Sequence, residues 1–234
     1  MKQTAGRQLT LDLAHRPALG REDFLVTPAN RAAVAMIDRF ADWTNHAVAI
    51  VGPRGSGKSH LVEVWRCMTG AERVTADGLR LEDVPRLLSS GALAIDDAPG
   101  SALDERALFH LLNLARQDRA NVLIAGVSHP AGWPVTLPDL ASRLRALPVA
   151  ELGPPDDDLL RGVLVKLFSD RQLAVEETVI AFLLLRMPRS LEAAGILVAE
   201  IDRRALERKA DISRGFVARV LEDIVSPGLF ETED

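Results

Sequence analysis

The stretch GPRGSGKS, residues 52–59, decides the fold. It satisfies the pattern Gly-x-x-x-x-Gly-Lys-Ser/Thr and overlaps the end of the apolar run HAVAIVG at 46–52. Between a strand and a helix, such glycines allow a tight turn whose N–H groups point at phosphate oxygens, and the helix adds its positive end. An ordinary glycine-rich turn is the alternative, but the complete motif in this setting favours a phosphate loop.

The polar residues of this loop are expected to contact a bound nucleotide. Lys58 brings a point charge to the outer phosphates, and the Ser59 hydroxyl can ligate Mg²⁺. His60 is expected to cover the loop rather than to ligate a metal ion. The predicted phosphate-binding residues are Gly52, Pro53, Arg54, Gly55, Ser56, Gly57, Lys58, Ser59 and His60.

Two carboxylates follow a second apolar run, ALAIDDA at 92–98. A phosphate-bound Mg²⁺ needs carboxylate support, and Asp96 is the expected metal-side group. Asp97 could polarise an attacking water. The alternative is that the Asp-Asp pair merely ends a strand and starts a turn.

Strands alternate with helices over residues 21–153, which predicts an α/β domain with a parallel sheet covered on both faces. The expected strands are 46–52, 92–96, 121–127 and 147–152, and the expected helices between them are 58–69, 81–88, 104–119 and 138–145. Before the first strand, Thr27-Pro28 resembles a helix start, with proline in the first turn.

The pattern changes after the double proline at 154–155, and residues 156–234 are expected to form a small helical domain. Its helices are expected from Asp156 onward and near 176–186, 190–208 and 213–224. Residues 1–20 are expected to be a flexible arm.

Composition bounds the class of protein. The chain has 234 residues, 47% hydrophobic and 26% charged, which is enough to fill a core within a soluble surface. It carries one cysteine, no run long enough to span a bilayer and no signal-peptide pattern, which favours a cytoplasmic protein without a membrane partner. The net charge of −5 disfavours DNA binding over the whole surface.

The layout of phosphate loop, Asp-Asp, further strand and helical domain resembles the DnaA-related AAA+ family. FLVTPANRAA at 24–33 is similar to the adenine-side opening of that family. The resemblance implies that Leu25 and Val26 lie near the base of a bound ADP or ATP, with Mg²⁺ at the phosphates.

Two arginines gain roles from the same resemblance. PDLASRL at 138–144 is similar to a segment that carries an arginine finger, which would be Arg143. MPRSLEAA at 187–194 is similar to the start of the sensor-2 helix, which would make Arg189 the nucleotide sensor in the lid.

The N-terminal stretch QLTLDL at 8–13 resembles the peptide by which short DnaA homologues bind the sliding clamp of DNA polymerase III. In an extended peptide alternate side chains point the same way, so its leucines can share one apolar groove. An edge strand of the chain's own sheet is the alternative. The predicted clamp-binding residues are Gln8, Leu9, Leu11, Asp12 and Leu13.

The resemblance implies a regulator of replication in the bacterial cytoplasm, held near the nucleoid by the replisome. The clamp left on DNA would recruit it, and Arg143 would then stimulate ATP hydrolysis on DnaA and so prevent re-initiation. DNA contact would be mainly through the clamp, and a homodimer is plausible because AAA+ proteins associate through the arginine-finger face. The initiator's helix-turn-helix domain is not expected in this sequence.

One departure from the family pattern concerns hydrolysis by the chain itself. Ala125, Gly126 and Val127 stand where the family usually has a polar sensor-1 residue, and Ser128 comes only afterwards. An apolar residue cannot hydrogen-bond a γ-phosphate. The chain's own hydrolysis is therefore in doubt, and Asp97 could be structural. An active AAA+ ATPase that loads or remodels a replication protein remains the alternative.

Overall fold

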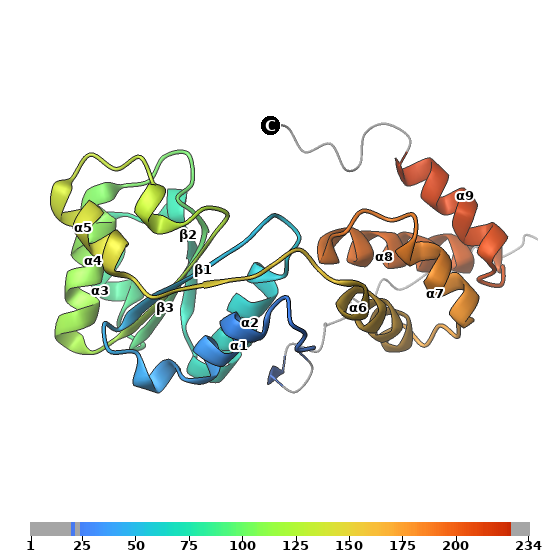
Figure 1. The fold of residues 1–234 in the computed structure, drawn as a ribbon, viewed down its shortest axis with the longest axis horizontal. Helices are drawn as coiled ribbons and strands as arrows, with labels where there is room; N and C mark the ends of the chain where they lie inside the picture. The colour runs from blue at the N-terminus through green and yellow to red at the C-terminus, as the bar shows by residue number, and fades with distance from the viewer. Residues whose placement is uncertain (1–19, 22–23, 226–234) are drawn as a thin grey trace, which may run out of the picture.

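The computed structural model describes residues 20–21 and 24–225. The predicted clamp-binding residues Gln8, Leu9, Leu11, Asp12 and Leu13 lie outside the described residues. Two parts follow each other along the described chain, a parallel sheet with helices on both faces and then a group of helices (Figure 1). The expected α/β fold class with a helical lid is confirmed.

The sheet has five parallel strands in the order β2-β3-β4-β1-β5. Its strands are β1 Ala47–Val51, β2 Glu72–Thr75, β3 Ala92–Ala98, β4 Asn121–Gly126 and β5 Val149–Glu151. The three inner strands are almost wholly buried, which explains why they are continuous apolar runs in the sequence.

Strand β2 was missed in the sequence, and the start of the first helix was placed too early. β2 is a four-residue edge strand that carries Glu72 and Arg73, so it has no apolar run to reveal it. Helix α1 is Arg31–Asp38, and residues 28–30 form a turn before it rather than its first turn.

Helices cover both faces of the sheet. On one face α1 and α2 Lys58–Thr69 pack with residues such as Val48 and Leu123. On the other face α3 Val84–Leu87, α4 Glu105–Asp118 and α5 Pro138–Ala146 pack with residues such as Leu93 and Ile124. Short 3₁₀ turns lie at Phe40–Asp42, Ala76–Gly78, Leu81–Asp83 and Pro130–Gly132.

The helical part has its own core. It comprises α6 Asp157–Asp170, α7 Glu177–Leu184, α8 Leu191–Arg208 and α9 Arg214–Val225. Asp156 caps α6, because its carboxylate accepts a hydrogen bond from the Leu159 backbone N–H at 2.8 Å. Phe168, Leu197 and Val217 are among the residues of its core. Within the described ranges, no helix is long and apolar enough to cross a bilayer.

Candidate nucleotide-binding site

The phosphate loop joins the carboxyl end of β1 to the start of α2, and it has the backbone that its glycines predict. Gly55 and Gly57 have φ angles of +73° and +98°, a region that L-residues avoid. A Cβ at Gly52 would lie 2.2 Å from the Leu152 carbonyl oxygen, so the loop begins where β1 and β5 leave no room for a side chain. The Ser56 side chain is buried beneath the turn, with no hydrogen-bond partner for its hydroxyl among the described residues.

Lys58 lies over this loop as the first residue of α2. Its ammonium donates hydrogen bonds of 2.8 Å to the carbonyl oxygens of Gly52 and Pro53. Burial lowers the pKa of Lys58, and the negative charges of Asp96 and Asp97 oppose that shift. The Lys58 ammonium therefore lies at the loop, at the same carboxyl end of the parallel strands as Asp96 and Asp97 of β3.

The two aspartates at the end of β3 have different surroundings. Asp96 is 1% exposed; its Oδ2 accepts a 2.6 Å bond from Arg73, and its Oδ1 accepts the backbone N–H of Asp97 at 3.0 Å. Asp97 is exposed and has a φ angle of +54°, which is strained for a residue with a Cβ. Arg73 was missed as a site residue because its strand was missed.

The end of β4 lies directly beside the loop, and its last residue, Gly126, has no room for a side chain. The Gly126 carbonyl oxygen accepts the Gly52 N–H at 3.2 Å, and a Cβ at Gly126 would lie 2.3 Å from the Ala98 carbonyl oxygen. Ala125 before it is fully buried, and Val127 after it is 55% exposed. Backbone packing therefore excludes a polar group at Gly126, the residue of β4 in register with the last residue of β1.

The lid contacts the phosphate loop through the start of α8. The Leu191 N–H donates to the Gly55 carbonyl oxygen at 2.9 Å, and a Cβ at Gly55 would lie 2.1 Å from Ser190 Oγ. The expected sensor Arg189 is adjacent, but its guanidinium pairs with Asp157 at 2.7 Å and donates to the Pro155 carbonyl oxygen at 3.3 Å. The structure thus brings the loop and the predicted sensor segment together, and it places the Arg189 side chain against the start of α6.

The predicted adenine-side residues precede α1. Leu25 and Val26 are 38% and 45% exposed, and Leu25 Cδ1 lies 2.7 Å from where a Cβ at Gly162 of α6 would stand. Buried Asn30 holds this segment, accepting the Thr27 N–H at 2.9 Å and donating to the Leu25 carbonyl oxygen at 2.9 Å. Asn30 was missed as a functional residue, although its place after Thr-Pro-Ala is where a turn-forming side chain is favoured.

Arg143 lies at the other end of the sheet from the loop. Its guanidinium carbon is 5.3 Å from the centre of the Phe109 ring, and it lines a cavity of about 120 Å³ with Asn45 and Ala47, at the amino end of β1. No ion pair joins Arg143 to a carboxylate in the part of the chain that the structure describes. Figure 1 shows α5 on the side of the sheet away from the lid. Arg143 is therefore too remote to serve the chain's own loop.

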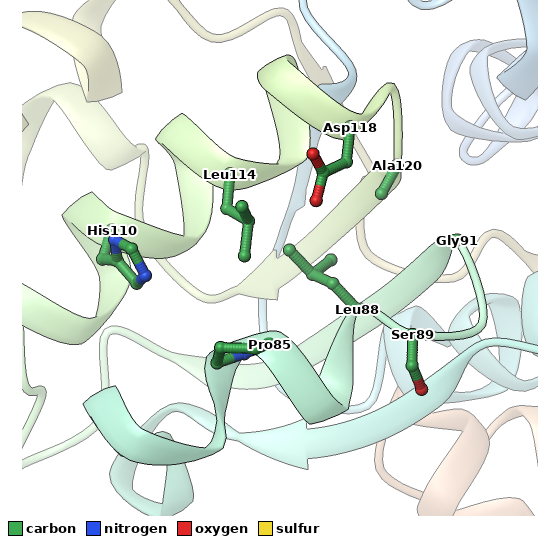
Figure 2. A pocket seen from close by; sticks show the side chains of 8 residues that line it. All are labelled: Pro85, Leu88, Ser89, Gly91, His110, Leu114, Asp118 and Ala120. Carbon is green, nitrogen blue, oxygen red and sulfur yellow. The ribbon is translucent and has the colours of Figure 1, made fainter.

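A second cavity, of about 470 Å³, lies between α3 and α4 (Figure 2). Its lining comprises Pro85, Leu88, Ser89, Gly91, His110, Leu114, Asp118 and Ala120. It contains a carboxylate and neither lysine nor arginine, so it lacks the chemistry of a phosphate site. It lies on the opposite face of the sheet from α2, the helix that follows the phosphate loop.

Comparison with solved structures places this geometry in a known fold. Domain III of the Thermotoga maritima replication initiation protein DnaA superposes with a TM-score of 0.75, at 20% identity over 91% of this chain and 99% of that one. The chain has the AAA+ fold of DnaA domain III. No family model matches the sequence.

Two further structures show the same fold. The replication initiator DnaA bound to AMPPCP and single-stranded DNA gives a TM-score of 0.65, at 20% identity over 84% of this chain and 69% of that chain. The Thermotoga maritima RuvB Holliday junction branch migration motor gives a TM-score of 0.62, at 20% identity over 84% and 67%. The likeness therefore covers both the sheet and the lid.

Proposed function

We propose that this chain is an adenine-nucleotide-binding regulator of replication initiation, a short DnaA homologue of the Hda type. It holds ADP or ATP between the phosphate loop, the Leu25–Val26 segment and the start of α8. Bound to the sliding clamp through Gln8, Leu9, Leu11, Asp12 and Leu13, it presents Arg143 to ATP on DnaA. DnaA–ATP then becomes DnaA–ADP, and re-initiation is prevented.

The observation that carries this proposal is the location of Arg143. The side chain stands at the amino end of β1, away from the chain's own loop, and no carboxylate of the described chain neutralises it. An arginine there is available to a neighbouring molecule. An arginine finger stabilises the charge that develops during phosphoryl transfer and is worth about 10³–10⁵ in rate in GTPases.

Two features of the loop's own surroundings support a nucleotide-holding protein rather than a motor. Gly126 has no room for a side chain that could contact a γ-phosphate. Asp97, the expected water-polarising group, is exposed and lies on a strained, irregular end of β3. Both features weaken hydrolysis by the chain itself.

The test measures ATP hydrolysis by the chain alone, by DnaA alone, and by both with clamp loaded on DNA. Arg143→Ala should abolish stimulation of DnaA while leaving nucleotide binding and clamp binding intact. Arg145→Ala is the matched control, because Arg145 is on the same helix, is exposed and bonds only Ser142 among the described side chains. Full stimulation by the Arg143 variant would refute the role in trans.

The same assays separate the alternative, an active ATPase that loads or remodels a replication protein. Steady turnover by the chain without DnaA would favour that alternative. A triple substitution of Gln8, Leu11 and Leu13 by alanine should abolish clamp binding without unfolding the chain. Unchanged binding of the clamp by this variant would remove the recruitment step from the proposal.

A further inference from the structure

The guanidinium of Arg73 lies between two carboxylates next to the candidate site. Its Nη2 donates to Asp96 Oδ2 at 2.6 Å, and its Nη1 pairs with Glu63 Oε1 of α2 at 3.3 Å. The Asp96 side chain is 1% exposed, whereas that of Arg73 is 35% exposed. Arg73 therefore extends from the edge strand β2 and bonds the Asp96 carboxylate, which is shielded from water.

Strand pairing fixes this contact. In the β2–β3 register, Arg73 stands opposite Ala94 and Thr75 stands opposite Asp96. Arg73 and Asp96 are thus diagonal neighbours on one face of the sheet, a separation that a long side chain spans. That face is the one that packs against α2, because Ala92 and Ala94 belong to the same core cluster as Leu61. The pair therefore lies on the face of the sheet that α2 covers, the helix that follows the phosphate loop.

The bonding of Asp96 bears on whether its carboxylate fits a magnesium ion. Mg²⁺ is bound through carboxylate oxygens together with substrate phosphates, and it demands near-ideal octahedral geometry. Both Asp96 oxygens already accept hydrogen bonds, one from Arg73 and one from the backbone of Asp97. Ser59 is exposed and could still contribute its hydroxyl. Asp96 is 1% exposed, so a metal ion could use its remaining lone pairs only in competition with the Arg73 guanidinium.

A buried carboxylate requires a counter-charge, and removing one member of a buried pair costs more than the pair itself contributes. The guanidinium of Arg73 supplies that counter-charge with a short, charge-assisted bond. A metal ion at Asp96 would have to displace Arg73. The Arg73 guanidinium would then lose this carboxylate partner, and the metal would gain only one ligand. The charge of Asp96 itself is therefore balanced without a divalent cation.

We propose that Arg73 takes the place of a metal ion as the counter-charge of Asp96, so that this chain binds an adenine nucleoside diphosphate without requiring Mg²⁺. The inference rests on the proposed nucleotide binding and deepens it.

The test is calorimetric titration of ADP into the purified chain, once with MgCl₂ and once with EDTA. For the unmodified chain the dissociation constant should change by less than about threefold between the two buffers. Arg73→Gln frees the Asp96 carboxylate, so its ADP binding should become at least about tenfold tighter with Mg²⁺ than with EDTA. Arg86→Gln is the matched control: Arg86 also pairs with a carboxylate on β2, Glu72 at 3.0 Å, and its loss should leave the ratio unchanged.

Each outcome decides the matter. A dissociation constant of the unmodified chain that rises by about threefold or more in EDTA overturns the inference and leaves the proposed function standing. An Arg73→Gln variant that stays insensitive to Mg²⁺ also overturns it. Absence of ADP binding in both buffers defeats the proposed function itself. If Arg73→Gln does not fold, the comparison of buffers for the unmodified chain remains decisive, since it needs no substitution.

Discussion

Substituting Gly55 by alanine would place a methyl group between the phosphate loop and the lid. The new Cβ would stand 2.1 Å from Ser190 Oγ and 2.7 Å from Ser190 Cβ, and the residue would keep a φ angle of +73°. The left-handed backbone costs an L-residue about 1–2 kcal/mol. Overpacking adds about 1–3 kcal/mol. The native contact between loop and lid is therefore destabilised by about 2–5 kcal/mol.

If ADP is bound between these two parts, this cost appears as lost affinity. A loss of 1.4 kcal/mol is a factor of ten, so Gly55→Ala should weaken ADP binding by about 30-fold or more. Isothermal titration calorimetry measures the change directly, and a urea unfolding curve shows whether the chain remains folded. Unchanged ADP affinity in the Gly55→Ala variant would refute the close contact of loop and lid.

A second substitution separates steric from backbone effects. Ser190→Gly removes both clashing atoms, so in the Gly55→Ala background it should restore about 1–3 kcal/mol of ADP binding. Alone it should cost only a few tenths of a kcal/mol, because glycine is itself tolerated at the cap of α8 that Ser190 forms through Ala193. A double variant that binds ADP no better than Gly55→Ala would show that Ser190 is not the obstacle.

Two further predictions concern side-chain networks away from the loop contact. Asn30→Ala leaves the Thr27 N–H and the Leu25 carbonyl without their partner and should lower the free energy of unfolding by about 1–3 kcal/mol, measured in urea; an unchanged midpoint would contradict the network. Hydrogen bonds from Arg203, and then from Arg204, lower the pKa of Glu200 to about 2 from 4.5. The stability due to ionised Glu200 is therefore complete above about pH 4.5 and lost as the pH falls toward 2, so the stability difference from Glu200→Gln should shrink over that range; a pH-independent difference would contradict the assignment.

The inner part of the fold is predictable because buried strands require continuous apolar runs in the sequence. Strands β1, β3 and β4 are continuous apolar runs, and the helix after the loop is found at the expected residues 58–69. An edge strand and the ends of helices have a weaker sequence pattern. β2 is half exposed and charged, and α1 begins only after a turn at 28–30, with an N-cap residue, Asn30, that makes no side-chain cap hydrogen bond.

In the candidate site, too, one part is predictable from the sequence and another part is not. Its loop is predictable because local backbone geometry requires glycine at 55 and 57. Contacts across the fold are not predictable from local pattern. The pairing of Arg73 with Asp96 depends on strand register, and the contact of Ser190 with Gly55 depends on how the lid meets the sheet. The roles of Arg143 and Arg189 stay predictions, carried by resemblance and now tied to definite positions.

The distance between Arg143 and the phosphate loop gives the molecule two unlike ends. A contact between two unlike ends is head-to-tail. When such contacts do not close into a ring, they can repeat and form an open row, or filament, of similar modules. A chain that offers only its arginine end to such a row joins it at one terminus and reaches one nucleotide there. On the proposed function, one such chain would therefore act on one nucleotide at a time, at the end of the row.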